Sequence, residues 1–463
     1  MSKIEVNTIE PQCGTTLTLG ASGDTVALAS GAKMSGVQAI SWQTGSIKTA
    51  TFTAAAGEGY FCNTSGGAFT VNLPAGSAGA VVAVSDYTRT FQTNNLTVSP
   101  NGSEKIGGQA NDAVLSTEGQ SATFVYVDST EGWINVQETS NSVTGRSFVT
   151  ATGGSVSIVC TNFKVHTFTG PGTFCVSTIS CVAAENTVGY QVVAGGGGGG
   201  HQNGGGGGGG GFREGRNAPI DNFTASPLVA NAPTNAITLT ATSYPITVGG
   251  GGTAGASPST AATSGANSVF STITSAGGGG GGSSQCSPGN IGTAGGSGGG
   301  SAFIFPGASG CFPASPLGNA AGNTPPVSPP QGNNGGYGFT KWVGWVAGGG
   351  GGGAGAVGTN VTGNGVLGSG GNGVSSSITG SSVSRSGGGG AGVQTGGPTG
   401  TGAQGGTGGG GNAASPYGDG VSGGTATAGS ANTGGGGGGN GNGSPNVGAA
   451  GGSGVVIIRY KFQ

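Results

Sequence analysis

The sequence predicts an all-β N-terminal part, consisting of an intertwined stem plus a small β domain, followed by a glycine-rich domain of packed polyglycine II helices with short β-strands. Short β-branched and aromatic runs, separated by Gly, Asn, Pro and Ser turns, fill the first 140 or so of the 463 residues. Of the 113 glycines, 18 lie in residues 1–145 and 95 in the remaining 318. Long segments with helical periodicity are missing, so we expect little or no α-helix.

Residues 1–45 are expected to form the β stem. Their alternating pieces, such as LTLG and TVALASGA, are each too short to bury a face alone, so other copies of the chain are the simplest partners. Residues 46–142 are expected to form a globular β domain. Its β-forming runs, spaced as in a sandwich or barrel, are KTATFTAA, GYFCNTS, AFTVNLP, AVVAVSDY, NLTVSP, ATFVYVDS and GWINVQET.

Residues 143–194 are predicted to be a connecting β segment that enters a glycine-rich domain over residues 195–463. Several β-forming pieces lead directly into oligoglycine, as YQVVA does before the first run, and the chain closes with the strand-like SGVVIIRYKFQ. The runs of four or more glycines are 195–200, 204–211, 249–252, 277–282, 348–353, 387–390, 408–411 and 434–439.

Three interpretations of these runs are open at the level of sequence. A phosphate-binding loop needs a helix beginning in the glycines, or a Lys followed by Ser or Thr, and neither follows. A flexible linker fits the entropy of glycine, but linkers do not recur this often between β-forming segments. The third interpretation, which we favour, is that the runs form extended three-residue-per-turn helices. Their N–H and C=O groups would then bond to neighbouring runs.

Charge and motif content exclude several function classes. The net charge is −6 over residues 1–145 and +4 beyond, which is too little basic charge for a nucleic-acid partner. No apolar run is long enough for membrane insertion, and Glu5 and Glu10 interrupt the region where a signal peptide would be apolar. We therefore expect no nucleic acid, no membrane insertion and no secretion signal.

No catalytic, metal or cofactor site is predicted, so we expect the protein not to be an enzyme. The carboxylates of the glycine-rich part are widely spread, and His166 and His201 have no suitably spaced partners. The seven cysteines show no C-x-x-C pair and fit small apolar fillers in a reducing cytosol, although a bridge between Cys175 and Cys181 stays open.

Two inserts between glycine runs are the candidate binding surfaces. The first, residues 301–347, is rich in aromatic side chains, which stack on sugars or bury against a partner at small entropic cost. Alternatively, these rings cap the ends of the glycine helices. The candidate residues of this insert are Phe303, Phe305, Phe312, Tyr337, Phe339, Lys341, Trp342 and Trp345.

The second insert begins with GFREGRNAPIDNF and supplies Arg213 and Arg216. Both guanidinium groups are candidates for binding anionic groups on a cell envelope. The alternative, which we slightly favour, is that they pair with Glu214 and Asp221.

Several long motifs resemble those of known viral proteins. The opening MSKIEVNTIEPQCGTTLTLGASGDTV resembles the N-terminal segment of tail-fibre-like proteins of marine bacteriophages, and GEGYFCNTSGGAFTVNLPAGSAG with TVSPNGSEKI is similar to the β domain that follows it there. The part from VVAGGGGGG to GGSGVVIIRY resembles the glycine-rich domain found at the ends of phage fibres and in some bacterial surface proteins. In composition it is also similar to the tip adhesins of T-even-type phages.

This resemblance implies a virion component assembled in the host cytoplasm. Its N-terminus would dock on tail or other fibre proteins, the stem would be a homotrimer, and the glycine-rich module would bind a host outer-surface glycan or outer-membrane protein. The expected function is a fibre or tip adhesin. The alternative is a purely structural fibre or decoration protein without a receptor. An ice-binding protein would need regular tripeptide repeats, and these inserts are irregular.

Overall fold

The computed structural model describes residues 40–137, 147–258, 260–283, 290–303, 319–339, 346–363, 365–393, 402–414, 425–441 and 447–463. The chain divides into two compact units, Met1–Gly145 and Arg146–Gln463. Regular structure in the described residues is β, apart from one short 3-10 helix, η2 (Ala183–Asn186). The predicted fold class, β-strands with little or no α-helix, is confirmed for these residues.

The first unit contains two sheets, ordered β1-β3-β5-β8-β9 and β2-β4-β6-β7. Successive strands from β1 to β6 alternate between the sheets, and within each sheet these strands are parallel. The strands are β1 (Ser41–Trp42), β2 (Phe52–Thr53), β3 (Glu58–Cys62), β4 (Phe69–Asn72), β5 (Val81–Asp86), β6 (Leu96–Ser99), β7 (Ala113–Leu115), β8 (Ser121–Asp128) and β9 (Gly132–Asn135). Ser41 and Trp42, which the sequence assigns to the stem, thus pair with β3 of this unit.

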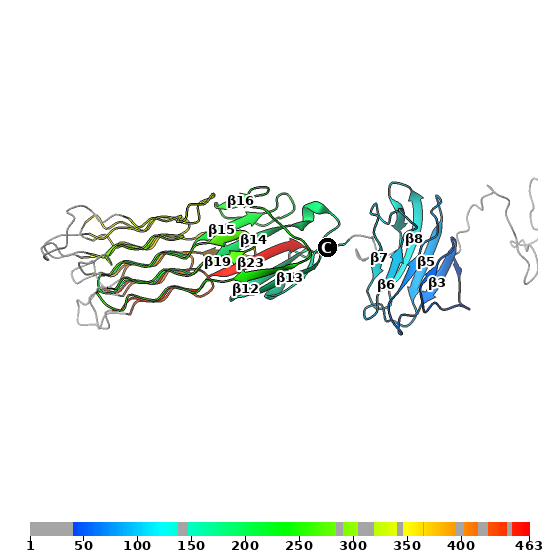
Figure 1. The fold of residues 1–463 in the computed structure, drawn as a ribbon, viewed down its shortest axis with the longest axis horizontal. Helices are drawn as coiled ribbons and strands as arrows, with labels where there is room; N and C mark the ends of the chain where they lie inside the picture. Colours follow the sequence, from blue (N-terminus) through cyan, green and yellow to red (C-terminus); the bar gives the residue numbers. More distant parts are fainter. Residues whose placement is uncertain are drawn as a thin grey trace, which may run out of the picture. The chain divides into compact units, whose positions relative to one another are not determined.

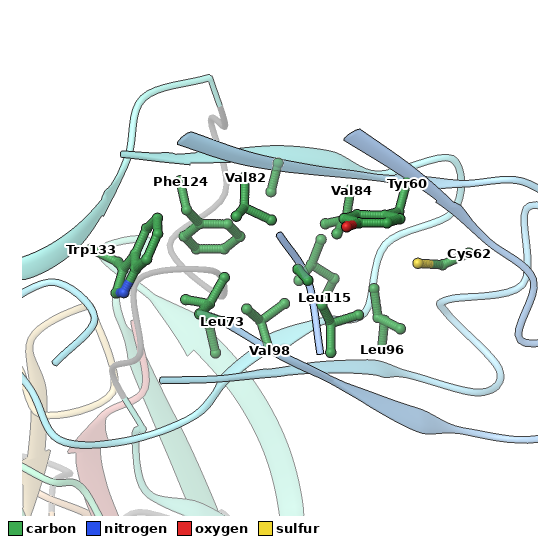
Figure 2. Packing of buried hydrophobic residues seen from close by; sticks show 14 of the residues in the cluster. Tyr60, Cys62, Leu73, Val82, Val84, Leu96, Val98, Leu115, Phe124 and Trp133 are labelled. Atoms are coloured by element: carbon green, nitrogen blue, oxygen red, sulfur yellow. The ribbon is translucent and has the colours of Figure 1, made fainter. Parts of the chain in front are cut away.

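Side chains from both sheets fill the core of the first unit. Leu73, Val82, Phe124 and Trp133 are completely or almost completely buried, and Figure 2 shows them converging between the sheets. Alternate residues of β4 and β6 face this core, as expected of strands with one buried face. The core therefore follows from the period-two pattern of the sequence.

The second unit is built on two larger sheets, ordered β10-β13-β18-β19-β20 and β11-β12-β23-β14-β15-β16, with β17 also pairing with β14. A separate hairpin is formed by β21 (Val374–Ser376) and β22 (Val383–Arg385). The sheet strands are β10 (Thr150–Thr152), β11 (Ser155–Val159), β12 (Phe163–Phe168), β13 (Gly172–Thr178), β14 (Thr187–Val193), β15 (Phe212–Arg216), β16 (Val229–Asn231), β17 (Ile237–Thr238), β18 (Ser243–Thr247), β19 (Ser268–Phe270), β20 (Ile273–Ser275) and β23 (Val455–Lys461).

The last strand, β23, lies inside the longer sheet, between β12 and β14 (Figure 1). Its residues alternate between two apolar clusters. Val456, Ile458 and Tyr460 face a cluster shared with the other sheet, whereas Val455 and Ile457 face a cluster that includes Ile378. The predicted C-terminal strand is therefore central to the unit. Residues 147–194 contribute β11, β12 and β14 to the sheet of β23, and β10 and β13 to the other large sheet.

Candidate functional site

The glycine runs of the second unit extend directly from its sheets. Residues 195–200 follow β14, residues 204–211 lead into β15, and residues 277–282 follow β20. Figure 1 shows these extended segments lying side by side beyond the strands. They belong to no strand or helix, yet most of their residues are buried. We call these segments and those that bond to them the glycine rods.

Hydrogen bonds between rods repeat every three residues. The N–H groups of Gly195 and Gly198 donate to the carbonyls of Ala266 and Thr263, over 3.1 and 3.0 Å. The N–H groups at the other positions of this rod, including Gly196, donate to segments 449–452 and 205–208 in the same way. Residues three apart thus face the same neighbour, as in an extended helix with three residues per turn.

The carbonyls of the same rod face three further neighbours. Gly195 and Gly198 accept from Gly278 and Gly281 over 2.9 Å each, and the remaining carbonyls accept from segments 252–255 and 437–440. Six neighbours therefore surround one rod, so both the donor and the acceptor of each of its glycines are paired. This pairing agrees with the polyglycine II helices expected from the sequence, whose helical form itself stays a prediction.

Close packing explains why the rod positions are glycine. A Cβ atom on Gly197 would lie 2.1 Å from the carbonyl oxygen of Gly279, and one on Gly207 would lie 2.1 Å from that of Gly197. Both distances are far below van der Waals contact, so an alanine forces the backbones apart. Because the N–H groups of residues 195–200 already donate to carbonyls, they do not form a phosphate cradle.

The rods have one end at the sheets and another end remote from them. We call the remote ends together the distal end. The turn at His201, Gln202 and Asn203 lies there, since it joins an outgoing rod to a returning one, and its last two residues have φ of 33° and 53°. Hydrogen bonds connect this turn to the ends of other rods. The His201 N–H donates to Ser283 Oγ over 3.0 Å, and that of Phe303 donates to the Asn203 carbonyl over 3.4 Å.

Two of the predicted aromatic residues pack near the distal end. Phe303 is 1% exposed, so its side chain is buried within the second unit. Phe339 is half-buried against an apolar cluster of Ala347, Val361 and Val393, and its N–H donates to the Ala347 carbonyl over 3.1 Å. For these two rings the geometry favours the capping alternative over open presentation to a partner.

Tyr337 is also half-buried, and its backbone belongs to a rod. Its N–H donates to Asn360 Oδ1 over 3.1 Å, and its carbonyl accepts from Val361 over 3.0 Å. The Ser301 N–H donates to the Gly336 carbonyl over 2.9 Å, so the segment that holds Tyr337 and Phe339 lies beside the one that holds Phe303. The other candidates of this insert lie outside the described residues: Phe305, Phe312, Lys341, Trp342 and Trp345.

The two arginine candidates lie on β15, away from the distal end. Arg213 is 7% exposed, and burial lowers the pKa of its guanidinium group. Arg216 is more open, and its side chain donates to Asn231 Oδ1 over 3.0 Å and to the Phe223 carbonyl over 3.5 Å. Burial raises the pKa of Asp221, a residue suggested as its partner, and the positive charge of Arg216 is among the smaller effects that oppose this rise.

Sequence reasoning missed the charged residue with the most central position. Arg459 on β23 is fully buried, with its Nε 3.8 Å from Asp221 Oδ1 and its guanidinium group 4.3 Å from the centre of the Phe163 ring. Burial nevertheless raises the pKa of Asp221 to about 6, because desolvation outweighs the hydrogen bond from Asn217 and the attraction of Arg459. The only available signal was an arginine inside the apolar run VVIIRYKF.

No group of three or more His, Cys, Asp or Glu side chains in the described ranges is placed to hold a metal ion. His166 is buried between the Gly153 carbonyl and Tyr460 Oη, at 2.6 and 3.0 Å, and burial lowers its pKa. Cys175 and Cys181 are both free thiols.

Among the residues that the structure describes, no helix has the length and apolar character needed to cross a membrane.

The geometry defines a class of protein in which sheets with apolar cores anchor hydrogen-bonded glycine segments. A family model described as a glycine-rich domain matches residues 167–461, and the chain belongs to that family. The match begins in β12 and ends at the last residue of β23, so it spans both the sheets and the rods. A search of curated proteins gave no match.

Proposed function

We propose that the protein is a phage fibre or tip adhesin that recognises a host surface through segments displayed at the distal end of the glycine rods. The observation that carries this proposal is the convergence of rod ends on one surface. Ser283, Phe303, Phe339, Val393 and Asn440 end described rods in the region of the turn at residues 201–203. Rods with paired backbones form a rigid base from which the intervening segments can vary.

The candidate residues fit this placement. Phe305 and Phe312 follow the rod that ends at Phe303, and Lys341, Trp342 and Trp345 follow the rod that ends at Phe339. Aromatic side chains commonly dominate the energy of recognition surfaces. The resemblance to phage fibre proteins supports a virion location, a homotrimeric assembly, and a host glycan or outer-membrane protein as the receptor.

The second candidate is a purely structural virion fibre or decoration protein. Burial of Phe303 and packing of Phe339 against Val361 favour it, because both rings act within the domain. The two functions predict different behaviour for the tryptophans between Phe339 and Val346.

Binding of the labelled full chain to host bacteria separates the two. Replacing Trp342 and Trp345 with Ala should weaken binding at least tenfold, because an aromatic hot spot contributes about 2 kcal/mol or more. Tyr87→Ala is the matched control, since Tyr87 is 56% exposed in the first unit. Unchanged binding by the double variant, with amide protection of residues 195–200 retained, would leave the structural fibre as the explanation.

A further inference from the structure

The longer sheet of the second unit has an edge strand without the usual protection against pairing. Strand β11 forms hydrogen-bonded pairs with β12 only, among the strands that the structure describes. Its sequence, SVSIV, contains no charge and no proline, and its five pairs with β12 run without a register shift. Natural edge strands are usually guarded by Lys, Pro, a bulge or short length.

Length and exposure distinguish β11 from the other edges. At five residues it is longer than the edge strands β1, β2, β7, β9, β10, β16 and β20, which have two to four. Val156 is 52% exposed and Ile158 is 60% exposed, and both lie on the same face of the strand. The strand therefore presents a free backbone edge and an apolar stripe together.

We propose that β11 pairs with the β11 strand of a second copy of the chain, in an antiparallel arrangement centred on Ser157. The free edge selects an extended strand as the occupant, because only a strand satisfies its N–H and C=O groups in sequence. The order of apolar residues in β11 favours another copy of the same strand as that partner. Pairing about Ser157 places Val156 of each copy opposite Ile158 of the other.

The two faces of this pair are chemically matched. One face gains two Val–Ile pairs across the strands, which cover the exposed apolar stripe of both copies. The other face places Ser157 opposite its own equivalent and Ser155 opposite Val159, so no charges meet. The contact is two-fold symmetric and closes on itself. It is independent of receptor binding and distinct from the expected three-chain stem.

Cysteine cross-linking of the full chain tests the register. Ser157→Cys, in a background with the exposed thiols of Cys160 and Cys175 replaced by Ser, should yield a covalent two-chain species under mild oxidation. Ser155→Cys is the matched control, because its two copies would lie four residues apart in register and should not cross-link. The background chain alone measures cross-linking through the remaining cysteines.

A second pair of variants tests the apolar contact. Adding Ile158→Lys to the Ser157→Cys chain should reduce the two-chain species at least tenfold, whereas adding Val357→Lys, at a valine 58% exposed among the rods, should not. A gel under denaturing conditions counts only covalently joined chains, so a three-chain stem does not obscure the result. Absence of the two-chain species, or equal yields from Ser155→Cys and Ser157→Cys, would overturn the proposal.

Discussion

The two units of this chain bury different parts of the polypeptide. The first unit packs side chains such as Leu73 and Phe124 between two hydrogen-bonded sheets. In the glycine rods of the second unit, the buried surface is the backbone itself, with six neighbours around residues 195–200. The core of the first unit depends on the volume of its side chains, whereas the packing of the rods depends on the absence of side chains. Removing a side chain should therefore damage the first unit, whereas adding one should damage the rods.

The largest expected effect is removal of β23. A chain ending at Ser453 loses the strand between β12 and β14 and residues of both apolar clusters, so the rods lose their anchor. We expect amide exchange at residues 195–200 to approach unstructured rates, while strands of the first unit stay protected. A chain shortened only by Gln463 is the control. Retained protection in the longer truncation would show that the rods fold without the sheet.

A side-chain deletion should affect only the first unit. Phe124 is fully buried, so Phe124→Ala should destabilise that unit by about 3–5 kcal/mol. Urea unfolding, followed by amide exchange resolved for each unit, measures this. Tyr87→Ala provides a control at an exposed ring. A similar loss in the second unit would mean that the two units unfold together.

A side-chain addition should instead damage the rods. Gly207→Ala places a Cβ atom 2.1 Å from the Gly197 carbonyl oxygen and should destabilise the second unit by about 1–3 kcal/mol. Gly250 is the matched control, since a Cβ atom added there would meet nothing within 4 Å and the residue is exposed. Gly250→Ala should be neutral or stabilise by about 0.4–1 kcal/mol. Equal effects at both positions would contradict a closely packed backbone core.

A smaller effect concerns pH, because both histidines lie in the second unit. Burial lowers the pKa of His201 below 6.5, so its folded state binds protons less readily than the unfolded state. Stability is then fully present above pH 6.5 and declines as the pH falls below it, by at most about 1.4 kcal/mol per pH unit for one group. Asp221, with its pKa raised to about 6, acts in the opposite direction.

The variant His201→Gln isolates the contribution of His201 to the pH dependence of stability. The difference in unfolding free energy between the natural chain and the variant cancels the contribution of Asp221 and leaves that of His201. We expect the natural chain to lose stability relative to the variant between pH 7.5 and about 5.5. A difference that stays constant across this range would show that His201 has the same pKa folded and unfolded.

The local sequence pattern predicted where strands lie, but it did not predict which strands pair with each other. Alternating apolar residues located β4 and β6, and the run VVIIRYKF located β23. The insertion of β23 between β12 and β14 was not predictable, because hydrophobic pattern alone does not specify strand partners. The recurrence of oligoglycine indicated packed segments, but not which run bonds to which.

The candidate site was predicted less well than the fold. For Arg213 and Phe303 the sequence left open a binding role and a role within the fold, and both side chains are buried. Their burial depends on partners distant in sequence. An aromatic residue next to a glycine run is not part of an alternating apolar pattern, so the sequence does not indicate whether its ring is buried. The two tryptophans and Lys341 stay predictions because they lie outside the described residues.

The smallest expected effect is that of salt, which should differ between the first unit and the glycine rods. The first unit has a net charge of −6, whereas the only charged residue described between Gly249 and Ser453 is Arg385, which is buried. Raising ionic strength from about 0.1 M to 1 M shortens the screening length from about 10 Å to 3 Å. Repulsion within the first unit should then weaken and its stability should rise, while the stability of the rods should change less. Amide exchange in NaCl, with sucrose as an uncharged control, measures both units at once. A larger salt response in residues 195–211 than in β3 and β5 would imply that charge, and not backbone pairing, controls the stability of the rods.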